Sequence, residues 1–232
     1  MQTWTTKSGC RILRILATRS NVFLLSCRAR NILVDTGPRS QWGRLDARLK
    51  SLGIDRVDHL ILTHSHYDHA DNAQRLKHRY GASVIVHRAE ARFMEGEGVA
   101  VPGGTNAVTR YLVGTLGRVM AARGVEPCPG DILVDTVYDL GPLGLNAYVL
   151  PTPGHSPGSM SVVVDEEIAI VGDAVFGVFK WSVLPPYADD MAGTVESWGR
   201  LLETGCGLFL PGHGWAKTRA ELEAGYANRR RP

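Results

Sequence analysis

Cysteine is scarce in this chain of 232 residues, and none of its four cysteines lies in a Cys-x-x-Cys pair. The spacing therefore offers no cysteine-based metal or redox motif. Cys10 and Cys27 fall where a predicted hairpin could bring them face to face, but reduced, buried thiols are the expected state. The first seven residues also lack the apolar core of a signal peptide. Together these absences predict a cytoplasmic protein.

Long apolar runs and a strong charge of either sign are missing as well. No stretch approaches the length of a transmembrane helix, so no membrane contact is expected. Lysine and arginine exceed aspartate and glutamate by only three, 26 against 23, which is too little to predict nucleic acid as a partner. The chain is 44% hydrophobic and 21% charged. This composition and length predict one globular domain over residues 1–232.

Short apolar runs bounded by turn residues predict strands in both halves of the chain. The predicted strands are residues 11–16, 22–26, 31–34, 57–62 and 83–86, then 132–134, 136–140, 145–150, 161–164, 168–171 and 208–210. Helices are predicted over residues 44–52, 72–80, 194–202 and 217–227. Two strand-rich halves, each finishing with helices, predict two packed sheets with helices outside.

The middle of the chain differs from both halves. Residues 91–124 contain a glycine-rich loop and then a predicted helix with Val108, Leu112, Leu116 and Val119 on one face. We interpret this stretch as a helical insertion that acts as a lid over the site. The same face would also suit a partner subunit in a homodimer, and packing on the core of the chain itself is the remaining alternative.

Side chains that bind metals are concentrated directly after the predicted strand at residues 57–62. His64, His66, Asp68 and His69 fall within six residues, and a strand that ends in a tight loop would point them into one cavity. Neutral imidazoles and a carboxylate are the ligands that divalent metals such as zinc prefer. A single histidine here would indicate only a polar turn, but the cluster predicts a metal site.

Three more candidate ligands follow predicted strands, each beside a glycine. His155 follows the strand at residues 145–150, Asp173 the strand at 168–171, and His213 the strand at 208–210. Glycine lets the backbone turn sharply, and loops at strand ends are where a rigid scaffold presents functional groups. The repeated context predicts that all three join the cluster.

In these motifs the chain resembles the metallo-β-lactamase superfamily over residues 59–214. The resemblance implies an α/β (α+β) fold, a four-layer αββα sandwich of two mixed β-sheets with helices on the outer faces. It also implies that one metal is held by His64, His66 and His155 and a second by Asp68, His69 and His213. Asp173 would bridge the two ions. Asp35 matches the supporting aspartate of the family and would hydrogen-bond behind the cluster.

This resemblance implies a metal-dependent hydrolase with a small-molecule substrate. Two divalent ions, zinc by preference with iron or manganese as alternatives, would share a bridging hydroxide that attacks a carbonyl centre in an ester, thioester or lactone. Asp68 is the candidate catalytic residue, because it could orient the hydroxide or take its proton.

Departures from known branches of the family narrow the substrate. Asp173 stands where true β-lactamases usually carry Cys or Ser, so the chain resembles the glyoxalase II and lactonase branch instead. Only 19 residues follow His213, too few for the helical domain with which hydroxyacylglutathione hydrolases bind glutathione. Two alternatives stay open: a persulfide dioxygenase with one iron, and a phosphodiesterase or ribonuclease, which the small net charge disfavours.

The segment after Asp173 is apolar and bulky, with Phe176, Phe179 and Trp181 inside eight residues. Binding pockets are mostly apolar with a few polar groups. If this segment lines the pocket, it favours a small acyl substrate over a phosphodiester; filling of the core is the alternative. Phe176 and Lys180 are the candidate substrate contacts, Lys180 as the cation that steers a carboxylate or stabilises an oxyanion.

Overall fold

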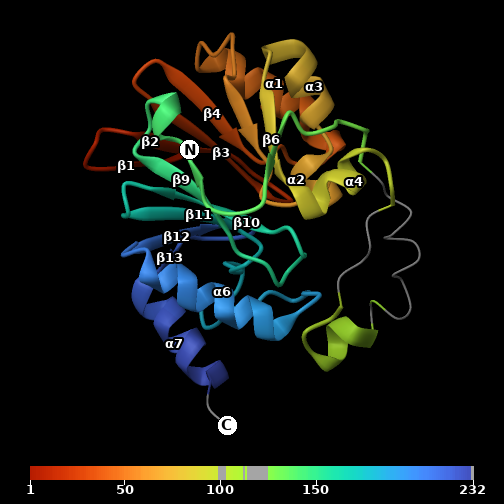
Figure 1. Ribbon diagram of the computed structural model, residues 1–232, viewed down its shortest axis with the longest axis vertical. Coiled ribbons are helices and arrows are strands. Elements are labelled where there is room, and N and C mark those ends of the chain that lie inside the picture. Colours follow the sequence, from red (N-terminus) through yellow and green to blue (C-terminus); the bar gives the residue numbers. More distant parts are fainter. Residues whose placement is uncertain (99–102, 112, 114–124, 231–232) are drawn as a thin grey trace.

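Two β-sheets face each other at the centre of the molecule, and helices cover the outer side of each sheet (Figure 1). The computed structural model describes residues 1–98, 103–111, 113 and 125–230. Within these residues no helix is both long enough and apolar enough to cross a membrane.

The first sheet has seven strands that lie in sequence order, β1 to β7. Four antiparallel neighbours come first: β1 (Gln2–Thr5), β2 (Arg11–Ala17), β3 (Asn21–Cys27) and β4 (Arg30–Val34). From β4 onward the neighbours are parallel: β5 (His59–Ile61), β6 (Ser83–His87) and β7 (Ile132–Val134). Helices α1 (Trp42–Ser51) and α3 (Ala73–Tyr80) cover its outer face, and the short helices α2 (Tyr67–Ala70) and α4 (Ala91–Met94) follow β5 and β6.

The second sheet has six strands in the order β13-β12-β11-β10-β9-β8. Their bounds are β8 (Tyr138–Asp139), β9 (Ala147–Pro151), β10 (Met160–Val164), β11 (Ile168–Gly172), β12 (Leu208–Pro211) and β13 (Lys217–Thr218). Only β11 and β12 are parallel neighbours, so this sheet is mixed as well. Helices α6 (Met191–Glu203) and α7 (Arg219–Arg230) cover its outer face (Figure 1).

Alternation along the strands divides the buried side chains among three hydrophobic cores. In β10, Val162 and Val164 belong to the core between the two sheets, whereas Val163 belongs to the core under α6 and α7. In β6, Ile85 likewise joins the central core and Val84 the core under α1 and α3. Successive residues of a strand point to opposite faces of the sheet, so each sheet is covered on both sides. The predicted four-layer αββα sandwich is confirmed.

The direction of the strands places several loops at one edge of the molecule. Strands β4, β5 and β6 are parallel, so the segments that follow them emerge on the same side. In the second sheet, β9 and β11 both run antiparallel to β10, and β12 runs parallel to β11. Strands β9, β11 and β12 therefore end together. Every predicted ligand follows one of these strand ends.

The cysteines differ from the prediction at one pair. Cys10 directly precedes β2, and Cys27 ends β3. The register of the antiparallel pair sets Arg11 opposite Ser26, so the two cysteines also lie opposite each other, with 4.5 Å between their Cα atoms, and form a disulfide. The prediction of reduced thiols is wrong for this pair, because the register of the hairpin, which the sequence left as one possibility, brings the two cysteines close enough to bond. Cys128 and Cys206 are free and buried, as predicted.

The predicted insertion at residues 91–124 is only partly described. The described part contains α4 and a helical stretch at residues 107–111. Its backbone pairs with the segment before α6, since Gly104 bridges to Tyr187 and the amide of Thr105 donates to the carbonyl of Pro186 at 3.0 Å. Leu112, Leu116 and Val119 lie outside the described residues, so the lid remains a prediction.

Candidate metal centre

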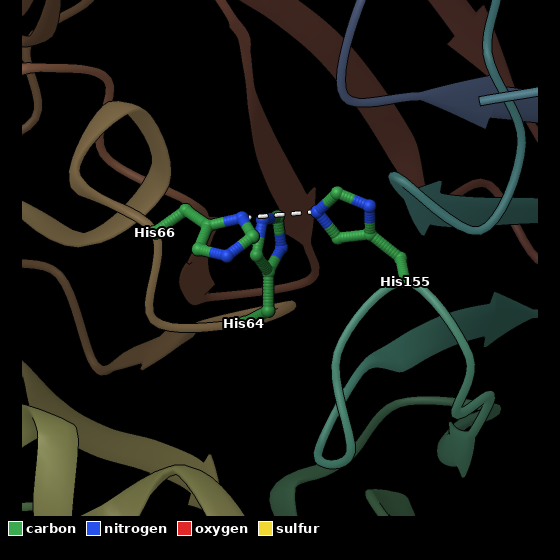
Figure 2. Close-up of side chains that lie close together, drawn as sticks. All are labelled: His64, His66 and His155. Carbon is green, nitrogen blue, oxygen red and sulfur yellow. Dashed lines mark hydrogen bonds between the residues drawn. The ribbon is translucent and has the colours of Figure 1, made fainter. Parts of the chain in front are cut away.

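Three of the predicted ligands, His64, His66 and His155, face one another across the edge of the two sheets. Figure 2 shows His64 and His66 on one loop and His155 on a separate loop that approaches from the opposite side. Nδ1 of His66 lies 2.9 Å from Nε2 of His155. One nitrogen from each ring lies within 4.8 Å of the other two, a spacing that suits three imidazoles around one ion.

A second group consists of Asp68, His69 and His213. Asp68 and His69 lie on the short helix α2, and His213 follows β12. Nε2 of His213 is 3.3 Å from Nε2 of His69 and 3.5 Å from Oδ2 of Asp68. Their ligand atoms also lie within 4.8 Å of one another. The structure thus brings together the same two sets of three residues that the family resemblance implies.

The carboxylate of Asp173 lies between the two groups. Its Oδ1 is 3.5 Å from Nε2 of His69, and its Oδ2 is 3.3 Å from Nε2 of His213. The same Oδ2 is 3.7 Å from Nε2 of His155, which belongs to the other group. Asp173 therefore occupies the position that a bridging ligand requires.

The imidazole nitrogens that face away from the centre are bound to oxygen atoms. Nδ1 of His69 lies 2.8 Å from Oδ2 of Asp35. Nδ1 of His155 lies 2.8 Å from the carbonyl oxygen of Tyr187, and Nδ1 of His213 lies 2.7 Å from the carbonyl oxygen of Arg19. Carbonyl and carboxylate oxygens only accept, so Nδ1 carries the hydrogen in all three rings. Nε2 then keeps a lone pair that is directed at the centre, as in metal-binding histidines.

Asp35 is a supporting residue that contacts both Thr63 and His69. It directly follows β4, is 2% exposed and has a positive φ of 62°, which aspartate tolerates better than most residues. Its Oδ1 accepts the backbone N–H of Thr63 at 2.8 Å, and its Oδ2 accepts both the Thr63 hydroxyl at 2.9 Å and Nδ1–H of His69. Because the Thr63 hydroxyl donates to Asp35, it accepts from Nδ1 of His64 at 3.0 Å. Asp35 thereby orients two of the histidines.

Burial and neighbouring charges shift the pKa values of the cluster in opposite directions. Burial lowers the pKa of His64 and of His66 well below the usual value, and the neighbouring histidines lower it further. Burial also lowers the pKa of His69, but Asp173, Asp35 and Asp68 outweigh it and raise this pKa to about 10. Burial raises the pKa of Asp173, yet His213 and His69 hold it well below its usual value. Without a metal the site therefore keeps ionised Asp173 beside a protonated His69.

The protein groups alone leave this centre short of positive charge. Among the described residues, Nε2 of His64 and Oδ1 of Asp173 are buried and have no hydrogen-bond partner. Nε2 of His69 and Nε2 of His213 also lie only 3.3 Å apart, so a proton on one of the two rings, or a metal cation, must lie between these atoms. Nitrogen and carboxylate donors are the set that divalent transition metals take. The residues therefore fit a divalent metal.

Two glycines let the backbone approach the cluster closely. A Cβ on Gly212 would lie 2.4 Å from Oδ1 of Asp173 and 2.6 Å from Cε1 of His69. At Gly172, which has a φ of 49°, a Cβ would lie 2.6 Å from Oγ1 of Thr63. Any side chain at either position would displace a ligand or its support.

Glu90 is a buried residue of the site for which the sequence carries no signal. It is 1% exposed and ends the short 3₁₀ helix Arg88–Glu90 after β6. Its Oε2 accepts the backbone N–H of Ser65 at 3.1 Å and the Ser65 hydroxyl, and its Oε1 accepts the backbone N–H of Gly158 at 2.9 Å. One carboxylate thus joins the loop of His64 and His66 to the loop of His155.

The two candidate substrate contacts lie in different places. The ring of Phe176 is 5.3 Å from that of His213, so Phe176 borders the metal centre. Lys180 is exposed and lines a separate cavity of about 390 Å³ together with Trp181, Trp198 and residues of α7. None of the metal-ligand candidates lines that cavity, whereas Phe176 lies beside the ring of His213.

Comparison with known families decides where the chain belongs. A model of the metallo-beta-lactamase superfamily matches residues 16–213. The chain belongs to the metallo-β-lactamase superfamily. This membership and the His/Asp cluster support a metal-dependent hydrolase that binds divalent metal. Assignment to the glyoxalase II and lactonase branch stays a prediction.

Relatives within the superfamily include proteins named as hydrolases. A probable metallo-hydrolase from Methanocaldococcus jannaschii is 25% identical over 198 residues, which are 84% of this chain and 87% of that protein. An atrochrysone carboxyl ACP thioesterase from Aspergillus fumigatus is 26% identical over 197 residues, 84% of this chain but only 50% of the thioesterase. The crystal structure of an archaeal superfamily protein from Sulfolobus tokodaii matches 96% of this chain and 86% of its own, with a TM-score of 0.65 and 20% identity. That last match concerns the fold alone.

Proposed function

We propose that this chain hydrolyses an ester or thioester of a small acyl substrate at a centre of two divalent ions, with zinc the preferred metal. The observation that carries the proposal is the position of Asp173, whose Oδ1 lies 3.5 Å from Nε2 of His69 and whose Oδ2 lies near both His213 and His155, at 3.3 and 3.7 Å. Seven donor residues also exceed the four that a tetrahedral ion uses.

Bound divalent ions would supply a water nucleophile at neutral pH and would polarise the carbonyl oxygen of the substrate. The chain supplies the remaining functions. Asp173 is held ionised, and the Nδ1 bonds keep the imidazoles of His69, His155 and His213 in the tautomer that directs a lone pair to the centre. Asp68 is half-buried, and its Oδ2 lies 3.5 Å from Nε2 of His213. This position beside a candidate ligand supports the proposal that the Asp68 carboxylate accepts a proton from water as the carbonyl is attacked.

An acyl substrate is favoured over a phosphodiester for two reasons. Phe176 places an apolar ring 5.3 Å from His213 at the border of the centre, and Lys180, a candidate cation for an anionic substrate, lies in a separate cavity. The thioesterase of Aspergillus fumigatus among the relatives supports the same carbonyl chemistry.

Metal analysis and a substrate panel test this proposal together. We expect two ions per chain after incubation with zinc, and higher kcat/KM for aryl esters and acyl thioesters than for a bis-aryl phosphodiester. Replacement of the bridging residue, Asp173→Ala, should lower both metal content and activity, the latter by at least about 100-fold. The exposed Asp55→Ala serves as the matched control and should change neither.

Several outcomes would contradict the proposal. A single ion per chain under excess zinc would rule out the dinuclear centre. Turnover of the phosphodiester above both carbonyl classes would show that the substrate class is wrong. Purification with one iron and thiol-dependent oxygen uptake would favour the persulfide dioxygenase instead.

A further inference from the structure

A row of aromatic side chains leads from the metal centre to the surface. The row starts at the ring of His213, and Phe176 follows at 5.3 Å between ring centroids. The ring of Phe179 lies 6.5 Å from that of Phe176, and the ring of Trp181 lies 5.6 Å from that of Phe179. Trp181 also lines the cavity that contains Lys180, so the row connects the metal centre with the rim of that cavity. Exposure increases along the row, since Phe176 is half-buried, Phe179 is 45% exposed and Trp181 is 85% exposed.

The backbone that carries these rings is held firmly at both ends. The amide of Gly177 donates to the carbonyl of His213 at 2.9 Å, and the amide of Phe176 donates to the carbonyl of Val183 at 2.9 Å. Nζ of Lys217 donates to the carbonyls of Phe179 at 2.7 Å and of Lys180 at 3.2 Å. The side chain of Lys217 is only 3% exposed. A buried ammonium group thus binds the middle of the loop, between its two backbone attachments at Phe176 and Gly177 and at Val183.

We propose that Phe176, Phe179 and Trp181 form the binding track for an extended apolar acyl chain of the substrate. This inference rests on the proposed hydrolysis of an ester or thioester. A chain whose carbonyl lies among the metal ligands meets Phe176 first, because that ring contacts the ligand His213. Large exposed apolar side chains that adjoin a site are typical of ligand or partner binding. Continuity of the row with the metal centre favours the substrate over a partner protein.

The track predicts a dependence on chain length. Complete burial of one methylene group increases binding affinity about fourfold. A methylene group that packs with only one side against a ring buries about half of its surface, so we expect an increase of about twofold per methylene. Octanoyl has six more methylenes than acetyl, so kcat/KM should rise by roughly 60-fold from acetyl to octanoyl thioesters. The acetyl substrate does not extend past Phe176.

Kinetics and binding of two truncated variants test the track. Phe179→Ala and Trp181→Ala should each lower kcat/KM for the octanoyl thioester more than for the acetyl thioester, and so flatten the rise from butyryl to octanoyl thioesters. Trp181→Phe, which keeps a ring, should restore most of the rise. Leu133→Ala removes an exposed apolar side chain of β7 and is the control for a general loss of surface hydrophobicity. An octyl thioether analogue of the thioester substrate cannot be hydrolysed and serves as a ligand for binding measurements. Its affinity should decrease in Phe179→Ala and Trp181→Ala and stay unchanged in Leu133→Ala.

The outcomes separate this inference from the proposed function. If no ester or thioester is hydrolysed but thioether binding still depends on Phe179 and Trp181, the hydrolysis proposal fails and the track stands. If thioesters are hydrolysed without dependence on chain length, or if both alanine variants keep that dependence, the track is refuted. It is equally refuted if Trp181→Ala converts a dimer to a monomer in sedimentation and leaves the chain-length profile intact, because the row would then be a subunit contact.

Discussion

Replacement of Asp35 by asparagine should weaken metal binding through the tautomer of one histidine. Asn fits the positive φ of 62° at this position, so the backbone should keep its course. The amide oxygen can still accept the backbone N–H of Thr63, as Oδ1 of Asp35 does at 2.8 Å. The amide nitrogen, which takes the place of Oδ2, can only donate. It therefore requires an acceptor where Nδ1–H of His69 now lies 2.8 Å away.

His69 can satisfy this requirement only by moving its hydrogen from Nδ1 to Nε2. Nε2 then has no lone pair for a metal, although it lies 3.5 Å from Asp173 and 3.3 Å from His213 at the centre. Loss of such a supporting group typically costs 10- to 100-fold in metal affinity, or about 1.4–2.8 kcal/mol. The effect should fall mainly on the ion held by Asp68, His69 and His213.

Competition with a chelator measures this loss. The first and second zinc ions are titrated in the wild type, in Asp35→Asn and in Asp55→Asn, which removes an exposed negative charge and keeps the site. Nitrogen NMR shifts of the His69 ring report the tautomer independently. Unchanged affinity for both ions in Asp35→Asn, with the metal-free variant folded, would refute the reasoning. So would weaker binding together with a hydrogen that stays on Nδ1.

Three further predictions concern the stability of the metal-free protein and the pH dependence of zinc binding. Glu90→Ala leaves the buried N–H groups of Ser65 and Gly158 without an acceptor, which costs roughly 1–3 kcal/mol for each group. Urea unfolding should therefore show a free energy of unfolding that is lower by about 2–6 kcal/mol. Glu90→Gln can keep one of the two bonds and should lose less, and a loss below about 1 kcal/mol for Glu90→Ala would contradict this account. The pKa of His69 is raised to about 10 in the folded protein, so its contribution to stability is complete below its unfolded pKa of about 6.5 and declines as the pH rises towards 10. Zinc must displace the proton of His69, so the affinity for zinc should increase about tenfold per pH unit between about pH 7 and 8.5. Calorimetry in buffers of different ionisation enthalpy should detect the released proton. A zinc affinity that does not change with pH would contradict this prediction.

The order of residues by itself determined the fold class and the set of candidate metal ligands that the fold brings together. Short apolar runs such as Met160–Val164 and Ser83–His87 specify buried strands. Successive side chains of a strand point to opposite faces of the sheet, so an apolar run fits a strand that has a hydrophobic core on each side. Histidine and aspartate at the ends of such runs, beside glycines, predict the site because a sheet delivers its strand ends to a common edge. Those arguments need only local pattern and chemical preference.

Tertiary structure decided what depends on distances between remote segments. The register of β2 and β3 pairs Cys10 with Cys27, and the fold places Glu90 between two ligand loops that are far apart in sequence. Packing also determines which nitrogen of each imidazole faces the centre, since the oxygens of Asp35, Tyr187 and Arg19 come from other parts of the chain. Phe176 and Lys180 are only four residues apart, yet one borders the metal centre and the other does not. A hydrogen bond or a ring contact depends on ångström-scale geometry, and a linear pattern does not contain that information until the chain has folded.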